Sequence, residues 1–182
     1  VGHSYGGVYL LAALSMGWLK QDNLAAGAVF GSQVKEGQSY LRFTPLNWLL
    51  RTTVWMIGHL PARLLKMGSE DEPPGITNEA LHWKQSGQWR SLQGEEYDRG
   101  LEGLQLPVFA AGASADTMDP PKGCRELFEA IGSDAKTFRE LGKANGYRRD
   151  YQHVDMLIGP NAEAEVWPEL RHWLDGLNQV HN

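Results

Sequence analysis

The segment Gly2-His3-Ser4-Tyr5-Gly6-Gly7, near the start of the chain, has the residue types and spacing of a nucleophile site. It fits the pattern Gly-x-Ser-x-Gly, and the apolar run at 8–14 that follows it has helical character. A serine at a sharp strand-to-helix turn sits in strained backbone, and small neighbours let the strand and the helix meet. Such a turn would expose the Ser4 hydroxyl beside backbone N–H groups that can stabilise a developing negative charge. A glycine-rich helix start without chemistry is the alternative interpretation.

A serine hydroxyl needs a base within hydrogen-bond distance, and histidine is the usual one because its ordinary pKa lies near neutrality. We predict that His153 is the base. It lies in a loop between a strand candidate and the last helix, and α/β sheets place their sites in such loops. The other histidines lie in the turn, in a helical insertion, on the last helix or in the tail: His3, His59, His82, His172 and His181.

Two aspartates that follow a strand candidate could orient this base. Asp119 directly precedes Pro120, so capping a helix would be sufficient to explain it. Asp116 lies closer to the end of the strand and has no such alternative role. We therefore predict Asp116 as the acid and keep Asp119 as the alternative. Asp155, two residues after His153, is expected to fix the loop.

The rest of the chain alternates between helix-like and strand-like segments, which could position these residues. Short apolar runs bounded by turn residues indicate buried strands, and spacing of three and four residues indicates helices. The order predicts an α/β architecture. The predicted elements are a helix ending at Gly17, a buried strand at 24–30, a buried strand at 106–112, a helix at 124–131, an edge strand at 135–141 and a helix at 168–177.

The segment between the first two strands has a different character. It contains helix signals, beginning with Thr44-Pro45 and again at 62–67 and 78–89, and no credible buried strand. We predict three parts: an α/β core at 1–34, a helical cap insertion at 35–103 and core again at 104–182. A helical layer without a lid role is the alternative. Four tryptophans of the insertion could roof an apolar pocket or simply fill a helical core: Trp48, Trp55, Trp83 and Trp89.

The composition limits the classes of protein. The net charge of −5 over 182 residues argues against a broad nucleic-acid-binding face. The single cysteine, Cys124, excludes an intrachain disulfide and a cysteine-rich metal site, and it suits the cytoplasm. No apolar run is long enough to span a membrane, because the best candidate, 46–65, carries three basic or histidine side chains. We expect no cofactor and no metal, and the sequence leaves the oligomeric state open.

Three segments together resemble the α/β-hydrolase superfamily. Gly2-His3-Ser4-Tyr5-Gly6-Gly7 is similar to the nucleophile elbow of lipases and esterases. Pro107-Val108-Phe109-Ala110-Ala111-Gly112, with Asp116 and Pro120-Pro121 after it, resembles the acid strand and loop. Tyr151-Gln152-His153-Val154-Asp155, with Leu157-Ile158-Gly159, resembles the histidine loop, although Gln152 replaces a glycine frequent there. The order of serine, acid and histidine is also that of the superfamily.

The resemblance implies the carboxyl-terminal half of an α/β-hydrolase fold with a helical cap. Ser4 would attack an ester-like carbonyl, His153 would take its proton, and Asp116 would hold the imidazole. The backbone N–H of Tyr5 would be one oxyanion donor. The substrate would be a small ester, apolar or lipid-like. An acyltransferase, a thioesterase, a cofactor-free haloperoxidase and a non-catalytic binding protein are the alternatives.

The turn at Ser4 needs a strand before it, and strands usually have five or six residues. The chain supplies little sequence there, and it has no initiator methionine. We therefore expect that the presenting strand and a second oxyanion donor lie upstream. On that expectation the 182-residue chain alone would fold poorly, aggregate through its exposed sheet edge and be inactive.

Overall fold

Four parallel strands form the sheet in the computed structural model, which describes residues 1–35, 44–65 and 70–180. The strands are β1 (Gly2–His3), β2 (Gly27–Phe30), β3 (Val108–Ala113) and β4 (Lys136–Leu141), and they lie in the order of the sequence. Neighbouring strands all pair in parallel, with Gly27 opposite Val108 and Val108 opposite Lys136. The predicted α/β class is confirmed.

The burial of the strands follows from their composition. β2 and β3 are buried at every residue, as apolar runs covered on both faces of a parallel sheet should be. β4 mixes polar and apolar residues and is mostly half-buried, and among the described residues it pairs only with β3. The prediction of an edge strand there is therefore confirmed. β2 begins three residues later than its predicted start at 24.

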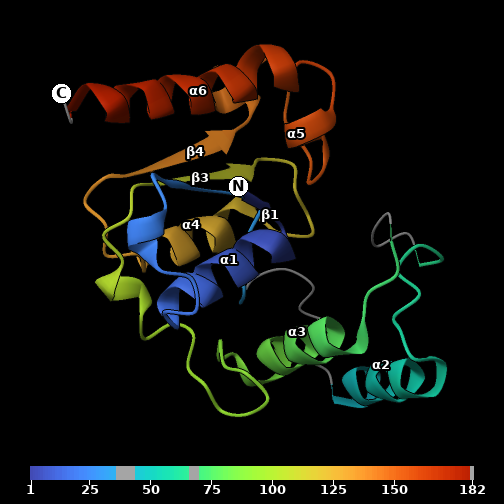
Figure 1. Ribbon diagram of the computed structural model, residues 1–182. Coiled ribbons are helices and arrows are strands. Elements are labelled where there is room, and N and C mark those ends of the chain that lie inside the picture. The colour runs from blue at the N-terminus through green and yellow to red at the C-terminus, as the bar shows by residue number, and fades with distance from the viewer. Residues whose placement is uncertain (36–43, 66–69, 181–182) are drawn as a thin grey trace. The chain divides into compact units, whose positions relative to one another are not determined.

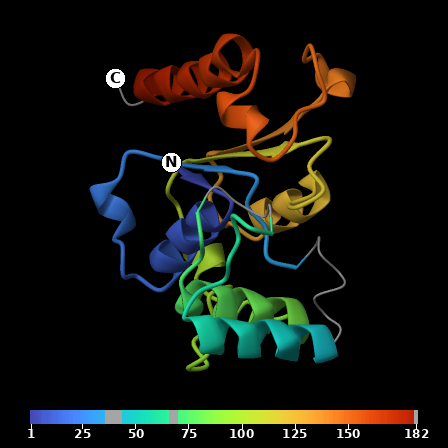
Figure 2. The same cartoon turned by 90° about the vertical axis from the view of Figure 1, so that its right-hand side faces the viewer.

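Helices cover both faces of this sheet (Figures 1 and 2). One face carries α1 (Tyr5–Ser15) and α4 (Pro121–Glu129), and the other carries α6 (Ala162–Val180). The short helix α5 (Asp155–Ile158) precedes α6. α1 ends where predicted, with Gly17 in left-handed backbone at φ 70°. The 3₁₀ helices η1 (Gln21–Asn23), η3 (Leu101–Gly103) and η4 (Lys143–Asn145) lie in connecting segments.

The last helix is longer than the sequence pattern indicated. α6 begins at Ala162, and Pro168 lies inside it instead of starting it. Ala162 and Val166 are buried in the same apolar cluster as Phe30 and Phe109, which accounts for helix on the amino-terminal side of the proline. Leu174, an apolar residue of this helix, is exposed over 39% of its surface.

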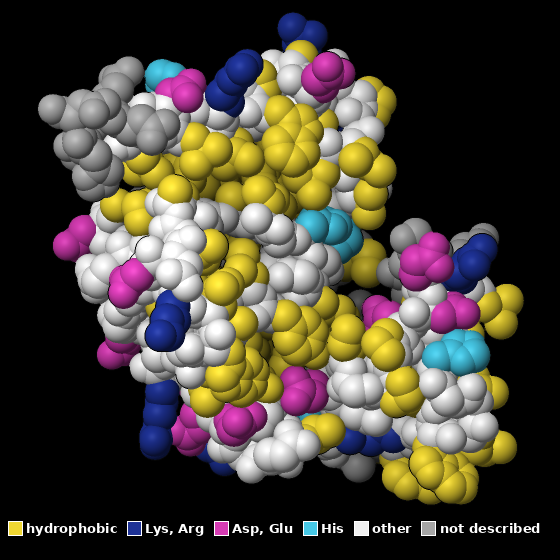
Figure 3. Space-filling view, viewed as in Figure 1, with side chains coloured by type: hydrophobic (Ala, Val, Ile, Leu, Met, Phe, Trp, Pro, Cys, Tyr) yellow, Lys and Arg dark blue, Asp and Glu magenta, His cyan; other side chains and the backbone are white. Residues whose placement is uncertain are grey.

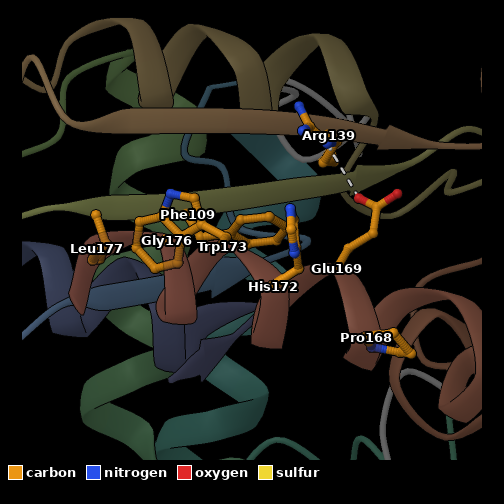
Figure 4. Close-up of a pocket in the computed structure, with 8 residues that line it drawn as sticks. All are labelled: Phe109, Arg139, Pro168, Glu169, His172, Trp173, Gly176 and Leu177. Carbon is orange, nitrogen blue, oxygen red and sulfur yellow. Dashed lines mark hydrogen bonds and ion pairs between the residues drawn. The ribbon is translucent and has the colours of Figure 1, made fainter. Parts of the chain in front are cut away.

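A cavity of about 600 Å³ lies between α6 and strands β3 and β4 (Figure 4). Phe109 and Trp173 line it, with their ring centroids 5.6 Å apart, and the Arg139–Glu169 ion pair of 3.2 Å lies at its polar end. Hydrophobic side chains gather below α6 in the space-filling view (Figure 3). None of the predicted site residues lines this cavity.

Residues Gln38–Glu96 form a second compact unit, separate from the unit made by Val1–Gly37 and Tyr97–Asn182. It contains α2 (Thr44–Ile57) and α3 (Pro74–Ser86), joined by a hydrogen bond of 2.9 Å from the Asn47 side chain to the carbonyl of Leu81. The predicted helix at 78–89 begins and ends earlier. Of the predicted helix at 62–67, residues 62–65 form a turn and the last two lie outside the described residues.

The four tryptophans of this unit divide into two pairs. Trp83 and Trp89 are buried, and the indole of Trp83 donates a hydrogen bond of 2.7 Å to the carbonyl of Arg90. Trp48 and Trp55 are exposed over 66% and 82% of their surfaces. Core packing thus explains the first pair only. The role of this unit as a cap stays a prediction.

No helix in the described ranges is long and apolar enough to cross a membrane.

Candidate active site

Ser4 occupies the turn between β1 and α1 in a backbone conformation that serine rarely adopts. Its φ of 53° and ψ of −128° carry a cost of about 1–3 kcal/mol, which the surroundings must offset. Its N–H donates to the carbonyl of Phe30 at 2.9 Å, so β2 holds the turn. Its own carbonyl accepts the N–H of Gly7 at 3.0 Å and the hydroxyl of Ser32 at 3.0 Å. These bonds fix the serine at the start of α1.

The glycines around Ser4 differ in how much they are needed. A Cβ on Gly2 would lie 2.5 Å from the Cα of Gly7, which is backbone and cannot move aside. A Cβ on Gly7 would collide with the Ser32 side chain. A Cβ on Gly6 would meet nothing within 4 Å. The close approach of strand and helix that the sequence pattern predicts therefore depends on Gly2 and Gly7, and not on Gly6.

The predicted acid and the predicted base lie together. Asp116 follows β3 and is 4% exposed, and its Oδ2 lies 2.7 Å from Nδ1 of His153. Its other oxygen accepts the N–H groups of Met118 and Asp119, each at 2.9 Å. Because a carboxylate only accepts hydrogen bonds, Nδ1 must be the donor. The neutral ring then keeps its lone pair on Nε2, the nitrogen that a general base uses.

The charges around His153 favour its protonated form. Burial alone would lower its pKa, but the hydrogen bond and negative charge of Asp116, together with the charge of Asp119, outweigh burial and raise the pKa above its ordinary value. The ring is therefore a stronger base than an exposed histidine.

Two residues that the sequence reasoning left without a role support His153. Gly31 is at φ 53°, and a Cβ there would lie 3.3 Å from the ring of His153. His3 donates from Nε2 to the carbonyl of His153 at 2.9 Å, and their ring centroids are 4.6 Å apart. Burial lowers the pKa of His3, which keeps this neighbouring ring uncharged.

The loop on the other side of His153 is fixed as expected. Asp155 accepts the N–H of Gln152 and forms an ion pair of 2.7 Å with Arg149. It therefore holds the loop, which was its predicted role.

The prediction that Asp119 caps a helix is wrong. α4 begins at Pro121, its N-cap is Pro120, and the cap has no side-chain hydrogen bond. With two consecutive prolines, the second occupies the first helical position, and the cap moves to a residue that has no polar side chain. The carboxylate of Asp119 instead accepts the Ser4 hydroxyl at 3.2 Å, and its Oδ2 is 3.8 Å from Nδ1 of His153.

The Ser4 hydroxyl has Asp119 as its hydrogen-bond acceptor within the described part of the chain, and not His153. One carboxylate oxygen thus lies between the serine and the histidine. Gln33, which is 2% exposed, donates to the other Asp119 oxygen at 2.6 Å. Sequence reasoning missed Gln33. The available signal was its position three residues after β2, at the same sheet edge as Asp116.

The residues that the structure describes contain no group of three histidine, cysteine, aspartate or glutamate side chains that could hold a metal ion. Cys124 is a buried free thiol, and burial raises its pKa.

Comparison with known proteins identifies the fold. No protein-family model matches the chain, and no curated protein matches it by sequence. Several solved structures do match. A monoacylglycerol lipase from Paleococcus ferrophilus has a TM-score of 0.63 at 15% identity, over 97% of this chain and 67% of the lipase. A soluble variant of monoglyceride lipase from Saccharomyces cerevisiae has a TM-score of 0.63 at 15% identity, over 97% and 60%.

A protein from Mycobacterium tuberculosis assigned as a non-heme bromoperoxidase also matches, with a TM-score of 0.60 at 12% identity, over 97% of this chain and 66% of that protein. These three structures and the four parallel strands show that the chain has part of an α/β-hydrolase fold. The chain spans about two thirds or less of the length of the proteins that it matches.

Proposed function

We propose that the chain carries the catalytic residues of a serine hydrolase that cleaves carboxylic esters. The observation that carries this proposal is the 2.7 Å hydrogen bond between Asp116 and His153, formed beside a serine in left-handed backbone. Ser4 is the nucleophile, His153 the base and Asp116 the residue that holds the ring in the productive tautomer.

The reaction needs one rearrangement of the site. The Ser4 hydroxyl must leave Asp119 and turn to Nε2 of His153, which then takes its proton as the oxygen attacks the ester carbonyl. The carbonyl oxygen becomes negative in the tetrahedral intermediate. Tyr5 is the first residue of α1, and its backbone N–H is our proposed oxyanion donor. His153 then protonates the leaving alcohol, and water releases the acyl group by the same steps.

The structural neighbours support an ester as the substrate, since two of them are named as lipases of monoacylglycerols. The names of these two neighbours also support an apolar acyl group as our preferred acyl class. Because one neighbour is assigned as a bromoperoxidase, a cofactor-free haloperoxidase that uses the same residues is the second candidate. Hydrolysis of an ester without any dependence on bromide or peroxide would favour the esterase.

A serine-directed phosphonate probe tests the proposal in the full-length protein. The expected result is one covalent adduct, mapped by peptide mass spectrometry to the peptide that contains Ser4. The variant Ser4→Ala should lose the adduct. Ser86→Ala is the matched control, because that exposed hydroxyl at the end of α3 donates to the carbonyl of His82 in its own helix and not to the Ser4 turn. An adduct that persists in Ser4→Ala would place the nucleophile elsewhere.

The rate of labelling should depend on pH through His153. Only the neutral ring can accept the serine proton, so the rate falls as acid protonates it. Because the pKa of His153 is raised, the fall should centre above the ordinary histidine value of 6.5. Asp119→Asn removes one of the charges that raise this pKa and should move the fall to lower pH. A centre below 6.5 in the unsubstituted protein would contradict this assignment.

A further inference from the structure

A second carboxylate stands next to the nucleophile, and the mechanism above gives it no chemical step. Asp119 accepts the Ser4 hydroxyl at 3.2 Å, and its side chain is only 16% exposed. When the Ser4 oxygen turns to His153 it stays close to this carboxylate, because Asp119 Oδ2 is itself 3.8 Å from Nδ1 of that ring, so an acyl carbon on Ser4 also lies near Asp119. Its charge acts at short range, with little water between the carboxylate and the substrate to screen it.

Gln33 holds this carboxylate in place and adds a second acceptor. Its amide nitrogen donates to Asp119 at 2.6 Å, and its side chain is almost fully buried. Its oxygen, Oε1, is buried and has no hydrogen-bond partner in the described part of the chain. A buried acceptor without a donor is costly, so this atom is suited to a ligand that brings one.

The other ionisable groups of the site do not neutralise the negative charge of Asp119. The carboxylate of Asp116 is already paired with His153 through their hydrogen bond of 2.7 Å. His3, the next ring, is kept neutral because burial lowers its pKa. When His153 is neutral, the two carboxylates leave the site negatively charged.

We infer that Asp119 determines specificity: with Gln33 it forms an acceptor subsite beside Ser4 that favours esters bearing a hydrogen-bond donor close to the scissile carbonyl. A protonated amine should be favoured most and a hydroxyl less, and a carboxylate should be rejected. This inference rests on the proposed function, because it places the acyl carbon on Ser4. It goes beyond that function in naming the charge of the preferred substrate.

Three ethyl esters of matched length test this subsite in the full-length protein: those of β-alanine, of butyric acid and the monoester of succinic acid. They carry a positive charge, no charge and a negative charge at the same distance from the carbonyl. The quantity measured is the ratio of kcat/KM for the β-alanine ester to kcat/KM for the succinate ester. We expect this ratio to exceed one and to fall about tenfold or more in Asp119→Asn.

Two further variants keep the test decisive. Asp119→Ser removes the same charge with a smaller side chain and should lower the ratio in the same way if asparagine weakens the fold. Asp134→Asn removes an exposed charge from the turn before β4, outside the site, and should leave the ratio unchanged.

The outcomes separate the two proposals. Ser4-dependent hydrolysis of the butyrate ester with a ratio that Asp119→Asn and Asp119→Ser leave unchanged would overturn the inference and leave the proposed function standing. A wild-type ratio below one would overturn the inference as well. The absence of Ser4-dependent hydrolysis of all three esters would overturn both.

Discussion

Asp116→Asn is expected to lower kcat/KM for a neutral ester about 10³–10⁴-fold, as loss of the orienting acid does in serine-histidine-aspartate sites. The carboxylate accepts a hydrogen bond of 2.7 Å from the Nδ1–H of His153, which keeps the proton on Nδ1 and the lone pair on Nε2. An asparagine can present its NH₂ group to Nδ1 instead, which favours the tautomer that has no lone pair on Nε2. Steady-state hydrolysis of an ethyl or p-nitrophenyl butyrate by the full-length protein measures the loss.

The matched control for this change is Asp119→Asn. Its carboxylate is 3.8 Å from the same nitrogen, too far for a hydrogen bond, so the loss for the neutral ester should be much smaller than in Asp116→Asn. Thermal unfolding of both variants separates lost catalysis from lost folding. The asparagine oxygen can still accept the N–H groups of Met118 and Asp119 in the Asp116 variant. A greater loss in Asp119→Asn would make Asp119 the acid.

The sequence was sufficient to place the sheet and the Asp116–His153 pair because both depend on local patterns. The buried strands β2 and β3 are short apolar runs between turn residues, and parallel strands bring the loops at their carboxyl ends to one edge. A loop position after β3 therefore indicated Asp116, and a loop position before the last helix indicated His153. Their contact follows from topology once the strands are parallel.

The sequence was insufficient for Asp119 because its contacts are not local. It appeared to be a helix cap from the proline that follows it, yet its partners Ser4 and Gln33 lie 115 and 86 residues away. The contact among these three side chains arises from the three-dimensional fold. The start of α6 was missed for a similar reason. Burial of Ala162 and Val166 in the core outweighs the helix-breaking tendency of Pro168.

The glycine pattern correctly predicted a close approach of strand and helix at the turn, but it did not identify which glycines that approach requires. The pattern Gly-x-Ser-x-Gly treats Gly2 and Gly6 alike. In the structure, an added side chain would collide at Gly2 and at Gly7, which lies outside the pattern, but not at Gly6. The reason is geometric. Gly2 and Gly7 are the points where the strand and the helix cross, while Gly6 is exposed on the outer side of α1.

Gly2→Ala is therefore expected to reduce the free energy of unfolding of the full-length protein by about 3 kcal/mol, the upper end for overpacked sites. The new Cβ would lie 2.5 Å from the Cα and 2.7 Å from the N of Gly7, and backbone atoms cannot move aside as a side chain end can. Relief requires β1 and α1 to separate, which would displace Ser4. Urea unfolding measures the stability, and phosphonate labelling of the folded fraction measures the site.

Gly6→Ala, in the same turn, should change the stability in the opposite direction. A Cβ there meets nothing within 4 Å, and alanine loses less conformational entropy than glycine on entering a helix. This variant should be more stable than the unsubstituted protein by about 0.5–1 kcal/mol. If Gly2→Ala and Gly6→Ala changed the stability equally, the approach of strand to helix would not be the constraint that holds Ser4 in its strained conformation. A selective loss in Gly2→Ala would mean that one contact between two backbones maintains the geometry of the nucleophile.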